Sequence, residues 1–98
     1  MNNKTIAKFP INEMEDSKVI VVNGELQTVL DVCVLNTETY VIAEITPSDV
    51  GLAHVIYEVR INETVPSNST FLKTLKNEIT NEVISYYIDN TLYHNFDI

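Results

Sequence analysis

A cysteine and a histidine are the residues of this chain best suited to covalent chemistry. Cys33 is the single thiol, and His54 is one of two histidines. A thiol and an imidazole in contact can act as nucleophile and base. Cys33, however, falls in the middle of a predicted strand, where thiols are usually inert, and no loop of the sequence is suited to an oxyanion hole. A small enzyme using Cys33 and His54 is therefore the disfavoured alternative, and we expect a protein that is not an enzyme.

Metal and cofactor chemistry has little support in the sequence. One cysteine with His54 and His94 falls short of the four ligands of a zinc site. The two glycines, Gly24 and Gly51, lie too far apart to form a phosphate-binding loop. The carboxylates that share a predicted strand face with His54 also share it with Arg60, so cross-strand salt bridges are favoured over a cation site. We expect no cofactor and no metal.

The charge of the chain is strongly acidic. The chain has six Lys and Arg residues and 14 Asp and Glu residues, which gives a formal net charge of −8. This balance argues against direct nucleic-acid binding, because phosphates require clustered cations. An acidic surface can instead meet a partner with a basic surface, such as the nucleic-acid groove of another protein. Acidity can also serve solubility alone.

Three acidic residues, Glu78, Glu82 and Asp89, form a stripe along a predicted C-terminal helix. Glu78 and Glu82 would rise about 6 Å apart along the helix axis, close to the phosphate spacing of one DNA strand. Such a stripe could imitate nucleic acid and occupy a basic groove. The plainer interpretation is a solvated helix face with Lys73 and Lys76 nearby.

The elements that would position these residues follow from hydrophobic period and turn signals. A single domain is expected, made of an N-terminal segment (1–17), a β-meander (18–62), a helix (69–90) and a tail (91–98). In the N-terminal segment, "KTIAKF" predicts a short edge strand. In the meander, Asn23-Gly24 predicts a two-residue type I′ hairpin, "NTET" at 36–39 a second turn, and "TPSDVG" at 46–51 a break between strands.

Beyond Pro66 the period changes from two to about 3.6 residues. One helical stripe is made by Leu72, Leu75, Ile79, Val83 and Tyr86. The predicted fold class is α+β: a four- or five-stranded antiparallel β-meander with one long C-terminal helix packed on one face.

A lone helix would leave the other face of the sheet open. The candidate protein-binding residues on that face are Tyr40, Ile42, Glu44, Ile56 and Glu58. Contiguous apolar groups among charges are typical of a contact surface for a second copy or another protein. Single exposed apolar residues are also normal on any surface, so both interpretations remain open.

The stretch "GELQTVLDVCVLNTETYVIAEITPSDVGLAHVIYEV", residues 24–59, resembles small acidic uncharacterised proteins of low-GC Gram-positive bacteria. The likeness rests on strand pattern and carries no function across. Separately, the small size, the acidity and the Asn/Thr/Ile-rich composition resemble an early gene product of a phage. Many such products inhibit host enzymes or bacterial immunity, the anti-CRISPR proteins among them.

The leading hypothesis is therefore a non-enzymatic protein-binding module, a phage or mobile-element inhibitor of a host nucleic-acid-handling or defence protein with a basic surface. The alternative is a homo-oligomeric domain, a homodimer for example, that pairs through its open sheet face. The chain has no apolar run near the ~20 residues of a membrane helix and no signal-peptide core. We expect no membrane contact and a location in the cytoplasm of a bacterial host.

Overall fold

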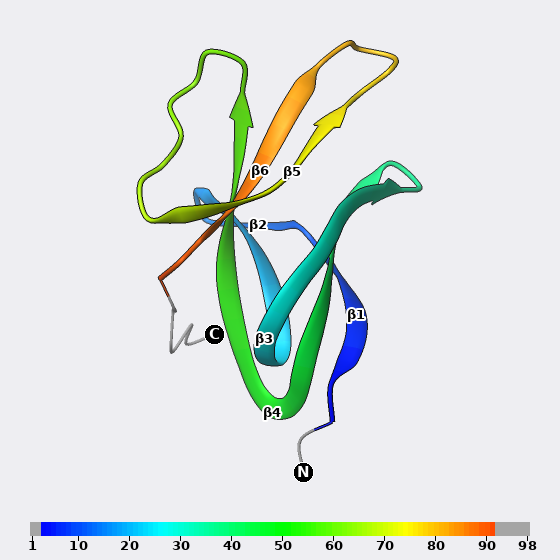
Figure 1. Ribbon diagram of the computed structural model, residues 1–98, viewed down its shortest axis with the longest axis vertical. Coiled ribbons are helices and arrows are strands. Elements are labelled where there is room, and N and C mark those ends of the chain that lie inside the picture. Colours follow the sequence, from blue (N-terminus) through cyan, green and yellow to red (C-terminus); the bar gives the residue numbers. More distant parts are fainter. Residues whose placement is uncertain (1–2, 92–98) are drawn as a thin grey trace.

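Two long strands that fold back on themselves build most of the molecule. The computed structural model describes residues 3–91. Within this range the strands are β1 (Thr5–Pro10), β2 (Asn12–Met14), β3 (Ser17–Leu35), β4 (Glu38–Arg60), β5 (Ser69–Lys76) and β6 (Val83–Asp89). Strands β3 and β4 pair antiparallel along most of their length, and β4 makes a U-shaped bend with one arm on each side (Figure 1).

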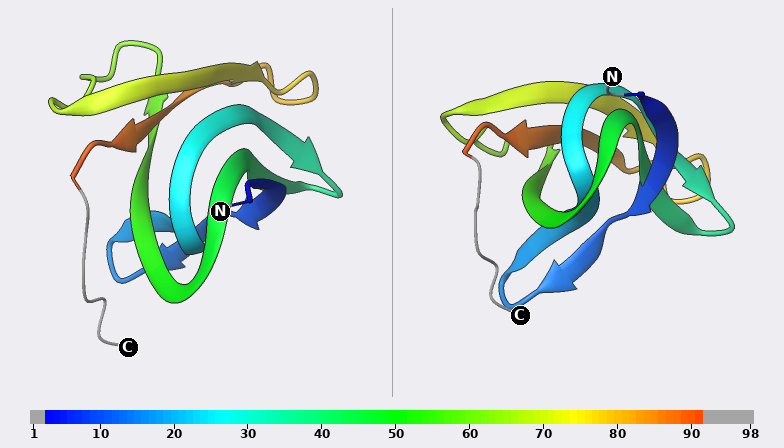
Figure 2. Two further views of the ribbon diagram at one scale, coloured as in Figure 1. Left: turned by 60° about the horizontal axis from the view of Figure 1, so that its bottom comes forward. Right: turned by 90° about the horizontal axis from the view of Figure 1, so that it is seen from below.

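The remaining strands attach to the two arms of β4. The order in the sheet is β2-β3-β4-β6-β5, with β1 paired separately to β4. Strand β1 lies against 40–45 on one arm, and β6 lies against 56–60 on the other. As a result the sheet curls round until its parts face one another (Figure 2). Within 3–91 no ladder joins the end strand β5 to β3, but Lys73 Nζ donates to Asp31 Oδ1 at 2.6 Å across this seam.

The bend depends on a close backbone approach at Gly24. In the register of the two strands, Asn23 lies opposite Gly51 and Gly24 lies opposite Pro47. Residues 48–50 of β4 therefore have no partner in β3. Gly24 has a φ of 137°, a region that side chains rarely adopt. A Cβ at this position would collide with the Thr46 carbonyl oxygen and lie 2.9 Å from Pro47 Cα. Only glycine fits here.

The three unpaired residues change which side chains of β4 point inward. Side chains alternate along a strand, so an insertion of three residues reverses the alternation. Before the bend, Val41, Ala43 and Ile45 point into the core, and after it the even-numbered Ile56 does, with His54 on the same side of the strand. The open-face prediction put Ile56 on the surface, but in the structure its side chain is only 2% exposed.

Strand β3 adjusts its own alternation with two β-bulges. Register shifts fall between Leu26 and Thr28 and between Val29 and Asp31. Each bulge adds one residue, so the inward positions Leu26, Val29 and Val32 are three residues apart. Leu30, which a regular alternation with Leu26 and Val32 would place in the core, is 49% exposed.

The core fills the space between the two arms of the bend. Buried side chains of both arms and of β6 form one cluster: Ile20, Val22, Val32, Val41, Ala43, Ile45, Ile56, Tyr86 and Ile88. Along β4, residues 53–56 are buried consecutively, so both faces of the sheet are covered in this arm. The prediction of one covered and one open face is wrong here.

The predicted α+β class is also wrong, because the fold is all-β and the C-terminal helix does not exist. No residue within 3–91 is helical, and 69–90 forms the hairpin of β5 and β6. Five of the seven residues of β6 are β-branched or aromatic, which favours a strand over a helix. The supposed helical stripe is divided between two strands and their turn.

The turn between β5 and β6 is stabilised by local side-chain chemistry. Asn77 Oδ1 accepts from the backbone N–H groups of Ile79 (2.9 Å) and Thr80 (3.1 Å). Asn81, with a φ of 66°, completes the reversal of the chain. Asparagine and threonine favour such turns because their side chains compete with helical backbone bonds.

Of the other turn predictions, one is confirmed and two are wrong. A tight turn at Asn36 and Thr37, both with positive φ, confirms the reversal expected at 36–39. Asn23-Gly24, by contrast, is not a hairpin but the bend inside β3, and 46–51 does not end a strand. Strand β1 confirms the predicted edge strand. The predicted tail beyond Thr91 lies outside the described residues.

The requirement for glycine at the bend can be tested with the other glycine as a matched control. Gly24→Ala should lower the free energy of unfolding by about 3 kcal/mol or more, since it combines a strained φ with a backbone collision. Gly51→Ala should change it by less than about 1 kcal/mol, because its Cβ would meet only Asn23 Oδ1, at 3.7 Å. Urea unfolding followed by circular dichroism measures both, and equal stability of the two variants would contradict the role of the bend.

Candidate functional site

The predicted acidic stripe is dispersed in the structure. Glu78 lies exposed in the turn between β5 and β6. Glu82 comes just before β6, and its Oε2 accepts from Arg60 Nε at 2.8 Å. Asp89 is only 9% exposed at the end of β6, where its carboxylate accepts from the Tyr57 hydroxyl and from the backbone N–H of Thr91. The helical spacing that would imitate phosphates is therefore absent from these three residues.

The predicted sheet-face site is divided by the bend. Tyr40, Ile42 and Glu44 are half-buried on the arm that pairs with β1. Lys8 Nζ lies 5.0 Å from the centre of the Tyr40 ring, a cation–π arrangement. Glu44 forms an ion pair with Lys4 at 3.5 Å. Ile56 and Glu58 lie on the other arm, so the five candidates do not form one surface.

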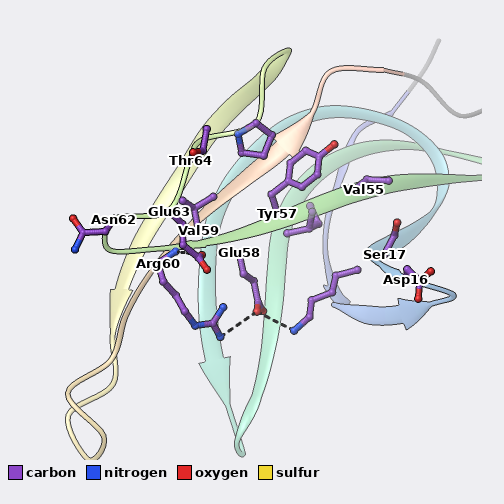
Figure 3. A pocket seen from close by; sticks show the side chains of 13 residues that line it. Asp16, Ser17, Val55, Tyr57, Glu58, Val59, Arg60, Asn62, Glu63 and Thr64 are labelled. Carbon is purple, nitrogen blue, oxygen red and sulfur yellow. Dashed lines mark hydrogen bonds and ion pairs between the residues drawn. The ribbon is translucent and has the colours of Figure 1, made fainter.

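A hollow of about 660 Å³, which we call the edge hollow, lies where β4 continues beyond the start of β3. It is lined by 16–18, by 55–60 and by the segment that follows β4. Figure 3 shows the Glu58 carboxylate directed toward Arg60, while Tyr57 and Val59 project from the opposite side of the strand. The hollow therefore follows the edge of the strand and includes side chains from both of its faces.

Glu58 is the centre of an ion-pair network in the edge hollow. Its Oε1 lies 2.9 Å from Lys18 Nζ and 3.8 Å from Arg60 Nη2, and its side chain is 14% exposed. The hydrogen bond to Glu58 raises the pKa of Lys18 against the opposing effect of burial. Because these charges neutralise one another, the hollow offers little attraction to a charged ligand. The predicted cross-strand salt bridging around Glu58 is confirmed.

Cys33 and His54 lie at different positions along the β3–β4 ladder. Cys33 faces Tyr40 close to the hairpin turn, whereas His54 faces Ile20 beyond the bend. The register does not pair them as nucleophile and base. His54 is 4% exposed, its Nε2 has no hydrogen-bond partner within residues 3–91, and burial lowers its pKa below the ordinary value. His54 also lines a pocket of about 410 Å³ at the bend.

A cleft of about 500 Å³ separates the ends of two hairpins, and we call it the hairpin cleft. Both hairpin ends lie on the same side of the molecule (Figures 1 and 2). The cleft is lined by Val34, Thr37, Thr39, Leu75, Lys76, Asn77, Glu78, Ile79, Glu82, Ile84 and Tyr86. Ile79 is 94% exposed and Val34 is 55% exposed. Sequence reasoning placed Ile79 in a buried helical stripe, and only the Asn-rich "KNEITNE" turn could have indicated otherwise.

No family model, curated protein or solved structure matches this chain. Within residues 3–91 no group of three or more His, Cys, Asp and Glu residues is placed to hold a metal ion. In the same part of the chain, no helix is long and apolar enough to span a membrane. His94 lies outside the described residues.

The ion-pair network can be tested at Glu58. Glu58→Gln should lower the free energy of unfolding by about 1 kcal/mol, since it leaves Lys18 and Arg60 without their shared carboxylate, and added salt should reduce the loss. Glu13→Gln is the matched control, because Glu13 is 78% exposed and lies 4.0 Å from the same Lys18 Nζ. Urea unfolding at low and high salt compares them; a loss as large for Glu13→Gln as for Glu58→Gln would refute a special role for Glu58.

The burial of His54 predicts a pH dependence of stability. Its pKa in the folded chain lies below the 6.5 of an unperturbed histidine, so the unfolded chain takes up the proton first as pH falls. The stability that the neutral His54 contributes is fully present above about pH 6.5. It is lost at up to about 1.4 kcal/mol per pH unit as the pH falls from there toward the pKa of His54 in the folded chain. Urea unfolding of the wild type and His54→Leu between about pH 7 and about pH 5.5 isolates this slope. Parallel curves for the two proteins would show that His54 contributes nothing to it.

Proposed function

We propose that this chain is a non-enzymatic protein-binding module whose contact surface is the hairpin cleft. The observation that carries the proposal is the exposure of Ile79, 94%, at the rim of a cleft with an apolar floor. A large aliphatic side chain held in water by an ordered turn has no role in the core. Exposed apolar groups rimmed by polar residues are typical of protein contact sites.

The charge around the cleft supports a partner with a basic surface. Glu78 and Glu82 lie at its rim, with Lys76 the single cation among its lining residues. The whole chain carries a net charge of −8, which would steer a cationic partner toward it. The occupant we propose is a segment of another protein that places an apolar side chain beside Val34 and Ile79 and an Arg or Lys beside Glu78.

The same charges support the choice of a foreign partner over a second copy. Two copies that each carry a net charge of −8 would repel one another, whereas a basic partner would be attracted. A host nucleic-acid-handling or defence protein has the basic surface that this cleft would need, and inhibition of such a protein is the biological role we propose. The sheet face that was expected to pair two copies included Ile56, which is buried.

A displayed random-peptide library tests the proposal directly. We expect selection on the immobilised protein to enrich peptides that combine an apolar residue with Arg or Lys, and we expect added salt to weaken their binding. Ile79→Asp should lower their affinity about thirtyfold, as loss of a hot spot does, while leaving stability within about 0.5 kcal/mol.

Ile6→Asp is the control, because Ile6 is also exposed, at 64%, and does not line the cleft. It should bind the selected peptides as the wild type does. Enriched peptides without basic residues, or equal binding to Ile79→Asp, would contradict the proposal. A stable dimer in light scattering that Ile79→Asp dissolves would identify a second copy as the occupant instead.

A further inference from the structure

Strand β5 has a free edge beside the hairpin cleft. Within residues 3–91 this strand pairs with β6 on one side and with no strand on the other, and Figure 2 shows it at the end of the curled sheet. Leu75 and Lys76, the last two residues of β5, line the cleft. The unpaired N–H and C=O groups of an edge strand are a template for an added strand.

The hydrogen bonds of the β5–β6 hairpin show which residues face the free edge. The Asn77 N–H donates to the Glu82 carbonyl oxygen at 2.8 Å, so the backbone of Asn77 is directed toward β6. Successive residues of a strand direct their backbone groups to opposite edges, so Leu75 is directed toward β6 as well. Thr74 and Lys76 therefore direct their N–H and C=O groups to the free edge, and both residues are exposed.

A strand added to this edge would also send a side chain into the hairpin cleft. Leu75 packs against the core and lines the cleft together with Ile84 of β6. Side chains that lie directly opposite one another on neighbouring strands share one face of the sheet. The residue of the added strand opposite Leu75 would thus point into the cleft, and its two neighbours would point away from it.

The charges of β5 favour a foreign segment over the same edge of a second copy. The strand carries Lys73 and Lys76 and no carboxylate, and lysines on an edge strand oppose the pairing of two such edges. The free edge of β1 is less suited to strand addition, because Pro10 has no N–H to donate.

We propose that the protein segment in the hairpin cleft binds in an extended conformation, as a strand added to the free edge of β5. This inference rests on the proposed function and specifies the form of the partner. The segment would place an apolar side chain opposite Leu75, and alternate backbone groups of the segment would bond to Thr74 and Lys76. Such strand addition takes its affinity from main-chain hydrogen bonds and its specificity from alternate side chains.

Peptides selected on the immobilised protein give the first test, because methylation of a backbone nitrogen removes an N–H and keeps the side chain. We expect N-methylation at every second residue to weaken binding about tenfold or more, since those N–H groups face β5. Methylation at the residues between them should weaken binding about twofold or less. Isothermal titration calorimetry measures each dissociation constant.

The two ways of failing are distinct. If selection yields no binding peptide, the proposed function itself is refuted. If peptides bind but the N-methyl scan shows no alternation, strand addition is refuted while the protein-binding function stands.

Proline on the edge tests the same contact from the protein side. Lys76→Pro removes the N–H at the free edge and spares the bonds to β6, whereas Lys76→Thr removes the same charge and keeps the N–H. Lys76→Pro should bind the peptides about tenfold more weakly than Lys76→Thr. Equal affinities of the two folded variants would overturn the proposal, and the N-methyl scan decides if Lys76→Pro does not fold.

Ile6→Pro is the control for proline on an edge. The Ile11 N–H donates to the Thr39 carbonyl oxygen, so by the same alternation the Ile6 N–H faces the free edge of β1. This variant should bind the peptides as the wild type does. An equal loss in Ile6→Pro and Lys76→Pro would contradict a specific role for the β5 edge.

Discussion

The approach of the β3 backbone to the β4 backbone at Gly24 is the constraint on which the rest of the fold depends. Two strands of this length, if straight, would form a ribbon with an exposed apolar face and no core. The absence of a side chain at Gly24 lets the backbone pass the Thr46 carbonyl oxygen, and the ribbon folds back on itself. The fold-back lets Ile20, Val41 and Ile56 join one buried cluster.

The bend also determines which surfaces remain for binding. Once the ribbon folds, one arm has both faces covered, as the consecutive burial of 53–56 shows. The inward turn of His54 is a consequence of the same three-residue insertion, which reverses the side-chain alternation of β4. A residue that a flat sheet would expose thus becomes a buried imidazole beside a pocket.

The strands and one turn could be predicted from the sequence because their signals are local. The β1 segment, the alternation around 40–45 and the Asn36-Thr37 turn depend on neighbouring residues alone. The prediction of a helix over 69–90 is wrong. The leucines of this segment fit a 3.6-residue period, which indicated a helix. Its β-branched and aromatic residues, together with the turn residue Asn77, favour a hairpin. Asn23-Gly24 satisfies the rule for a two-residue hairpin equally well, and only the long-range pairing with β4 decides that it forms a bend.

The candidate site was harder to predict because it depends on where the curled sheet leaves apolar groups uncovered. Glu78 and Glu82 were singled out for a helical spacing that does not exist, yet both line the hairpin cleft with Ile79. In a flat sheet a whole face can carry a contact surface, so residues such as Ile42 and Ile56 were reasonable candidates. In a sheet that closes on itself, the faces are used by the core, and the hairpin ends and strand edges are what remain. An exposed isoleucine in an ordered turn, flanked by carboxylates, is therefore better evidence for a docking surface in this fold than any pattern along its strands.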